Sequence, residues 1–204
     1  MQLLWEVIMY RKQLTWQKIL CFAAIAVSAI VFLYALGLMT DLYDSLYPAM
    51  MDPNNIDNTY VPGSQIYYHM QPYNKQLLGA SIVMILLSCA LFLTSTHSRR
   101  RYYVGNIVTS VAWAAAGVGI SLWAHGQSEV FKAEFLKVDF AALEMFSKMM
   151  KKPYIDSTFW FDAHYAVFAL VVLVGLLLIL NLCWKFSLMK AEKKLIEEGK
   201  KASA

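Results

Sequence analysis

The chain has 204 residues, of which 59% are hydrophobic and only 16% are charged, and its net charge is +4. Soluble domains average about 45–50% apolar and about 25% charged residues. The composition therefore excludes an ordinary soluble domain and indicates a chain embedded in lipid. The basic residues form short groups beside hydrophobic runs, which excludes the extended basic face of a nucleic-acid-binding protein.

The three cysteines, Cys21, Cys89 and Cys183, all lie inside apolar runs. Neither a Cys-x-x-Cys pair nor another metal-type spacing is present in the sequence. We therefore expect small buried apolar side chains, and we predict neither a disulfide framework nor a zinc site from the cysteines.

The amino-terminal part contains two predicted segments. Residues 1–19 mix tryptophan, methionine and leucine with cations, which is typical of a helix lying at the cytoplasmic membrane interface. The alternative is a plain cytoplasmic continuation of the first helix. Residues 20–40 carry no charge, and because about 20 apolar residues cross the hydrocarbon core, they are predicted to form the first transmembrane helix.

A polar connection, residues 41–75, follows the first span. It contains four prolines and the run Asp-Pro-Asn-Asn, which disfavour a long helix. Its many tyrosines are typical of an aromatic belt at a membrane interface. We predict an outer loop here.

The second and third spans are predicted at residues 76–96 and 102–124, joined by a basic turn at 97–101. Such a short connection requires antiparallel neighbours. The third span is rich in small residues, which let helix backbones approach closely, so it is expected to be buried in the bundle. Its predicted helix-packing residues are Ala112, Ala115, Ala116 and Gly119.

The fourth span, residues 166–184, is almost uniformly aliphatic and precedes a basic tail, 185–204. Basic residues gather near both termini and in the 97–101 turn, so the positive-inside rule predicts cytoplasmic termini. The predicted fold is all-α: a polytopic membrane protein of one domain with four transmembrane helices, N-in/C-in topology and an outer amphipathic helix.

The second outer connection, residues 125–165, carries an apolar stripe with helical spacing. A helix with such a face lies on the membrane, caps its own bundle or docks against another subunit. Methionine side chains adapt well to partner surfaces. The predicted partner-binding residues are Phe131, Phe135, Val138, Met145 and Met149; Ala142 belongs to the same stripe.

Three histidines form a candidate cofactor site. His125 ends the third predicted span, His164 begins the fourth and His69 precedes the second, so all three are expected on the outer side. They could converge, with Asp162 as a partner of His164. Paired imidazoles bind haem b, a copper or zinc ion, or a quinone head group. The alternative is interfacial histidines bonded to water or head groups, and the spacing alone predicts no metal site.

The sequence carries no mid-membrane charge and no Walker A, nucleophile-elbow, zincin or dinucleotide motif. No catalytic residue is therefore predicted, and an enzyme is not expected. We expect a non-catalytic membrane subunit or scaffold of a larger complex, docking a partner through its outer loops. The default location is the plasma membrane, as in a bacterial inner membrane. Alternatives are a haem- or quinone-binding anchor of a redox complex, using His125 and His164, and an oligomeric channel or transporter component.

Overall fold

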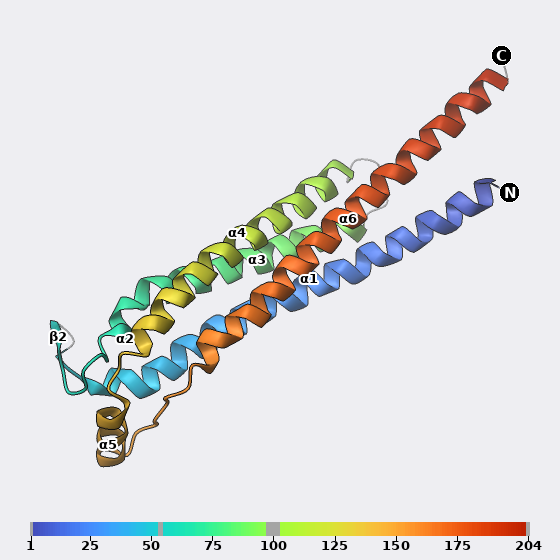
Figure 1. Cartoon of the computed structure of the whole chain (residues 1–204). Coiled ribbons are helices and arrows are strands. Elements are labelled where there is room, and N and C mark those ends of the chain that lie inside the picture. The colour runs from blue at the N-terminus through green and yellow to red at the C-terminus, as the bar shows by residue number, and fades with distance from the viewer. Residues whose placement is uncertain (1, 53–54, 97–102, 203–204) are drawn as a thin grey trace. The chain divides into compact units, whose positions relative to one another are not determined.

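The computed structural model describes residues 2–52, 55–96 and 103–202 (Figure 1). Helices account for most of them, which confirms the predicted all-α class. In chain order the elements are α1 (Gln2–Leu46), η1 (Tyr47–Ala49), β1 (Met50–Asp52), β2 (Asn55–Thr59), α2 (Ile66–His69), α3 (Gln71–Thr96), α4 (Tyr103–Phe135), α5 (Phe140–Met150) and α6 (Phe159–Ala202).

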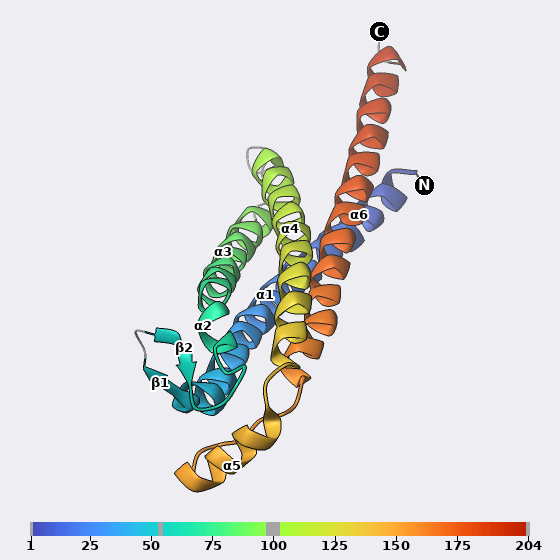
Figure 2. The same ribbon diagram turned by 60° about the vertical axis from the view of Figure 1, so that its left-hand side comes forward.

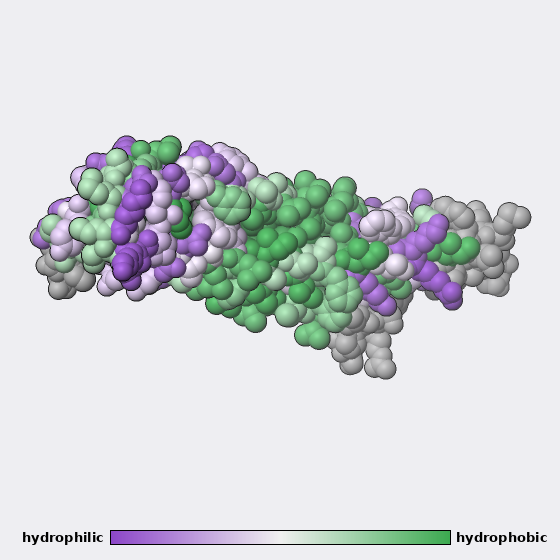
Figure 3. Space-filling model, turned by 90° about the horizontal axis from the view of Figure 1, so that it is seen from below, coloured by the Kyte–Doolittle hydropathy of each residue, from purple (hydrophilic) through white to green (hydrophobic). Residues whose placement is uncertain are grey.

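Four helices among the described residues are long and apolar enough to cross a membrane, which indicates a membrane protein. Figure 3 shows hydrophobic side chains gathered on the visible face, set apart from hydrophilic ones, as lipid contact requires. The four candidate spans are Ile8–Ala49, Ile66–Ser95, Val104–Phe135 and Phe159–Glu197.

The helices run further than the predicted spans. Helix α1 continues without a break across the boundary predicted at residue 20 and ends at Leu46, two residues before Pro48. Helix α4 passes His125 and reaches Phe135, while α6 extends into the basic tail. Lysine, glutamate and glutamine are good helix formers, so a helix does not end where its apolar run ends. The predicted basic turn, residues 97–101, lies outside the described residues.

The chain forms two compact units, and each of α1, α3, α4 and α6 contributes one segment to each unit. The first unit consists of Met1–Ala26, Met84–Val118 and Val171–Ala204. The second consists of Val27–Val83 and Gly119–Leu170. The second unit therefore contains α5, the hairpin, and the two connections that join α1 to α3 and α4 to α6 (Figure 2).

In the first unit, α4 packs through Trp113 and its neighbours. The indole N–H of fully buried Trp113 donates to Ser88 Oγ at 2.7 Å. A Cβ atom on Gly175 of α6 would lie 3.6 Å from Ala114 Cα, which measures how closely the two backbones approach. A Cβ atom on Gly117 would lie only 2.9 Å from Val171 Cγ1, so a larger residue there would displace its neighbour.

This packing face differs from the predicted one. Ala112 and Ala116 are half-buried, whereas Ala115 and Gly119 are exposed, and a Cβ built on Gly119 would have no described atom within 4 Å apart from its own stretch of helix. Small residues occur at helical spacing in more than one register of α4, so spacing alone does not select a face. The buried indole N–H of Trp113 needs a hydrogen-bond acceptor, which is Ser88 Oγ. Helix α4 therefore packs through the face that carries Trp113, beside the predicted face.

The first unit also holds a set of polar side chains that we call the amide network. The amide nitrogen of Gln13 donates to Gln17 Oε1 at 3.3 Å and to Asn181 Oδ1 at 3.4 Å. Asn181 Nδ2 also donates to Gln17 Oε1, so a triangle of amides joins α1 to α6. The members of the network are Gln13, Gln17, Ser95, Asn106, Asn181 and Lys185.

Ser95 extends the amide network to the other two helices. Its hydroxyl oxygen accepts from Gln17 Nε2 at 3.1 Å and from Asn106 Nδ2 at 2.9 Å. Lys185 Nζ donates to Asn106 Oδ1 at 2.9 Å. The network thus ties together all four long helices of this unit by hydrogen bonds between side chains.

In the second unit, the two connections pack on each other. A two-stranded antiparallel hairpin pairs Met50 with Thr59, an element that the sequence pattern does not predict. Beyond it, Gly63 has a φ of 88°, and a Cβ atom there would lie 2.7 Å from Val138 Cα. The left-handed backbone and the close approach both require glycine. The N–H of Asp139 donates to Pro62 O at 3.0 Å and fastens the contact.

Candidate functional site

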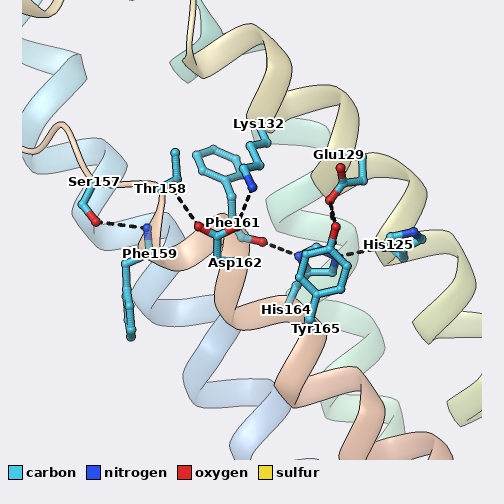
Figure 4. Close-up of polar contacts among 10 residues, drawn as sticks. All are labelled: His125, Glu129, Lys132, Ser157, Thr158, Phe159, Phe161, Asp162, His164 and Tyr165. Atoms are coloured by element: carbon cyan, nitrogen blue, oxygen red, sulfur yellow. Dashed lines mark hydrogen bonds and ion pairs between the residues drawn. The ribbon is translucent and has the colours of Figure 1, made fainter.

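A histidine–carboxylate cluster lies in the second unit, formed by His125 and Glu129 of α4 and His164 of α6 (Figure 4). One nitrogen of each ring and one carboxylate oxygen all lie within 4.8 Å of one another. His125 is exposed, Glu129 is half-buried and His164 is buried. The cluster is therefore open to solvent on one side and closed on the other.

Two helices position the cluster. His125 and Glu129 are four residues apart on α4, so they share one helix face. The start of α6 is held by Thr158, whose hydroxyl donates to Asp162 Oδ2 at 2.6 Å. Lys132 Nζ donates to Asp162 Oδ1 at 2.5 Å, and this ion pair joins α4 to the first turn of α6 beside the cluster.

The two histidine rings are in direct contact. His125 Nδ1 lies 2.9 Å from His164 Nε2, and the rings are inclined by 28°. His164 Nδ1 is hydrogen-bonded to the carbonyl oxygen of Phe161, and a carbonyl only accepts, so Nδ1 carries the proton. In the neutral ring, Nε2 then holds a lone pair, and His125 Nδ1 donates to it.

Tyr165 orients the carboxylate. Its hydroxyl donates to Glu129 Oε1 at 2.6 Å, and that oxygen lies 3.9 Å from His164 Nε2. The Tyr165 ring centroid is 4.0 Å from that of His164 and 5.5 Å from that of His125. Figure 4 shows the phenol beside both rings, so it forms one wall of the cluster.

His69 does not join the cluster. Its Nδ1 pairs with Glu134 Oε1 instead, so the structure brings together two of the three predicted histidines. Asp162 is not the partner of His164 either, because its oxygens accept from Lys132 and Thr158. Helix residues two apart point in different directions, which separates Asp162 from His164.

Sequence reasoning missed Glu129, Tyr165 and the Phe161 carbonyl. The spacing of His125 and Glu129 is a usable signal, because residues four apart on a helix can bind one ligand. The predicted span ended at residue 124, however, so no helix was expected to carry both. The carbonyl contact has no sequence signal, since every residue has a carbonyl.

The predicted partner-binding residues divide into two groups. Phe131, Phe135 and Val138 are buried, whereas Met145 and Met149 are each 71% exposed. The apolar stripe is not one helix: α4 ends at Phe135 and α5 begins at Phe140. Asp139 starts the new helix by accepting a hydrogen bond from the N–H of Ala142 at 3.0 Å. The buried residues Phe131 and Phe135 therefore belong to α4, whereas the exposed methionines belong to α5.

The cluster can bind a cation or hydrogen-bond a polar ligand. Two ring nitrogens and a carboxylate oxygen are ligands for divalent transition metals. Exposed His125 can also donate to or accept from a ligand such as a quinone head group. A haem iron lies between its axial ligands, so binding by both rings would require His125 and His164 to separate from their 2.9 Å contact.

Comparison of the chain with protein-family models, with curated proteins and with solved structures finds no match.

Proposed function

We propose that the chain is a non-catalytic integral membrane subunit or scaffold of a larger membrane complex, docking a partner protein through its outer loops. The observation that supports this most directly is the free face of α5. Met145 and Met149 are 71% exposed and Met150 is 50% exposed on this helix, outside the four candidate spans. Adjacent exposed methionines suit an adaptable binding surface.

Helix α5 is held firmly on its other side. Leu143 and Ser147 are buried, and the ring of Phe146 stacks on Tyr60 with centroids 5.5 Å apart. Asp139 caps its amino-terminal end. The helix cannot turn its methionines inward without exposing Leu143. A preformed face costs a partner little ordering entropy on binding.

Charged side chains border the methionine face. Lys148 Nζ donates to Glu144 Oε1 at 2.6 Å, and the carboxylate raises the pKa of the Lys148 amine. Lys151 and Lys152 come directly after the last residue of α5 and are exposed. An apolar centre with a charged rim is the usual arrangement of a protein interface, and it favours a protein partner over a lipid surface.

We further propose that both termini are cytoplasmic, since the basic residues at the two ends of the chain obey the positive-inside rule in that orientation. Helix α5 and the hairpin then lie on the outer side. In a bacterial plasma membrane, the docked partner would be reached from the periplasm. Accessibility of a cysteine introduced at Ala141, labelled on intact cells, would check the orientation.

Capture of the native complex tests the docking proposal. The tagged chain is solubilised in mild detergent from its own membranes, and co-purifying chains are quantified for Met145→Asp and Met149→Asp. We expect loss of a stoichiometric partner in both variants. Leu136→Asp is the matched control, because it adds the same charge at an exposed apolar residue outside α5. Undiminished recovery in the methionine variants would show that α5 is not the docking face.

A haem- or quinone-binding anchor of a redox complex is the second candidate. The nearness of His125 to His164 supports it, because two imidazoles can hold a haem iron once the rings separate, and a single exposed ring can hydrogen-bond a quinone. A reduced-minus-oxidised visible spectrum of the purified protein tests for haem, and extraction with organic solvent tests for quinone. A Soret band that disappears in His125→Ala would support haem. Colourless protein that yields no quinone would eliminate this candidate.

A further inference from the structure

We propose that the histidine–carboxylate cluster binds one divalent transition-metal ion, with Zn²⁺ as the best-fitting ion. The three ligands are His125 Nδ1, His164 Nε2 and the carboxylate of Glu129, all in the second unit. A fourth position stays open to solvent or to a small ligand. This inference does not depend on partner docking, since α5 contributes none of the three ligands.

The spacing of the ligand atoms fits a tetrahedral ion. Zinc–nitrogen bonds are about 2.0–2.1 Å long, so two ligands of a tetrahedral zinc ion lie about 3.3 Å apart. Here the two ring nitrogens are 2.9 Å apart, and His164 Nε2 is 3.9 Å from Glu129 Oε1. These distances lie on either side of the ideal value, so small side-chain rotations would complete the site.

His164 is already prepared as a ligand. Its Nδ1–H is hydrogen-bonded to the backbone carbonyl of Phe161, which fixes the ring orientation and leaves Nε2 with a lone pair. A backbone carbonyl or carboxylate in this role accompanies most metal-binding histidines. Since His164 is buried, the ring cannot swing away into solvent. The second ligand, Glu129, is oriented by the hydroxyl of Tyr165.

Ion binding requires one proton to move. In the metal-free cluster, His125 Nδ1 donates to His164 Nε2, so Nδ1 carries the proton of the neutral ring. When the metal–Nδ1 bond forms, that proton leaves Nδ1 and solvent protonates Nε2. The ring stays neutral and no net proton is released. The exposure of His125 allows this exchange and gives the ion its entry path.

The ligand set also selects the class of metal. Two imidazole nitrogens and one carboxylate suit Zn²⁺, Fe²⁺ or Co²⁺ better than Mg²⁺ or Ca²⁺, which prefer oxygen. The three cysteines all belong to the first unit, so no thiolate contributes a preference for Cu⁺. The second nearby carboxylate, Asp162, is already neutralised by Lys132, which leaves Glu129 to balance part of the ion's charge.

Titration of the full chain tests the site. The metal-stripped protein in detergent is titrated with Zn²⁺ alone by calorimetry, and with Co²⁺ alone by visible absorption. We expect one ion per chain and the intense d–d absorption of a four-coordinate Co²⁺ ion. The substitutions His125→Ala, Glu129→Ala and His164→Ala should each raise the Kd for Zn²⁺ by at least about 100-fold. Loss of only the hydrogen-bond partner of a metal ligand already costs about 10–100-fold in affinity.

The matched control is His69→Ala, which removes the other histidine–glutamate pair of the second unit and should leave Kd unchanged. Circular dichroism checks folding, and exposed His125 provides a variant that leaves the core intact. Absence of Zn²⁺ binding to the folded protein, or a wild-type affinity for Zn²⁺ in His125→Ala and Glu129→Ala, would overturn the site. Partner capture by His164→Ala is measured separately, so failure of the site and failure of docking are distinguishable.

Discussion

The amide network and the histidine–carboxylate cluster both gather polar side chains from different helices, yet they differ in what those side chains can do. In the network, Gln13, Gln17 and Asn106 are almost fully buried; the two glutamines bond to each other, and Ser95 links Gln17 to Asn106. In the cluster, His125 is exposed and its neighbours carry lone pairs suited to a metal. Fully buried polar groups hydrogen-bond to one another and hold the helices together, whereas a partly exposed cluster can also bind a ligand from solvent.

The energetic scale supports this distinction. Side-chain hydrogen bonds between membrane helices contribute on average about 0.6 kcal/mol each, and about 1.7 kcal/mol at most. The amide network therefore stabilises the first unit moderately and fixes which helix faces meet. The cluster has few such bonds to lose, so its residues should affect binding more than stability.

The largest expected effect comes from the core of the first unit. Trp113→Ala should lower the free energy of unfolding by about 3–5 kcal/mol, because it removes a fully buried indole and its hydrogen bond to Ser88. Unfolding in mixed micelles followed by circular dichroism measures this. The control Trp16→Ala removes an exposed indole from the same unit and should change little. Equal effects of the two variants would contradict the packing described for Trp113.

Next in size is the amide network itself. Gln17→Leu should cost about 2 kcal/mol, because it removes the hydrogen bonds of Gln17 to Gln13, Asn181 and Ser95 and leaves buried polar groups without partners. The affinity for Zn²⁺ should stay at the wild-type value. The same unfolding assay and zinc titration measure both quantities. A large loss of zinc affinity here would erase the distinction between the two regions.

Gly63→Ala should destabilise the second unit by about 1–2 kcal/mol, because alanine disfavours a positive φ and its Cβ atom would collide with the backbone of Val138. Hydrogen exchange should show faster exchange in α5 than in wild type. Gly79→Ala, at a position with open space around its Cβ, is the control. Unchanged exchange in α5 would mean that the Gly63 contact does not hold this helix.

The smallest expected effect is that of Tyr165→Phe. It removes only the hydroxyl that bonds to Glu129, so the affinity for Zn²⁺ should fall about 10-fold. Stability should change by less than about 0.5 kcal/mol, because the side chain is exposed. Calorimetry and unfolding measured on the same preparation test the two halves of this prediction. A stability loss without a loss of affinity would assign the tyrosine a structural role.

The sequence by itself determined the four long apolar helices that are candidate membrane spans, because a run of apolar residues long enough to cross a bilayer is a local property. It also indicated His125 and His164, since both stand where apolar runs meet polar connections. It did not determine where each helix ends. Helix α4 continues for ten residues beyond His125, so Glu129 came to share its face only in the structure.

Only the tertiary structure decided which faces meet. A helix in lipid is apolar all round, so hydrophobic periodicity does not show which side faces the other helices. That is why α4 packs through Trp113 and Gly117, whereas the sequence predicted packing through Ala115 and Gly119. The break before Asp139 and the pairing of His69 with Glu134 likewise depend on contacts between segments far apart in the chain. Such contacts exist only once the helices have assembled, and they bring the two rings and the carboxylate together.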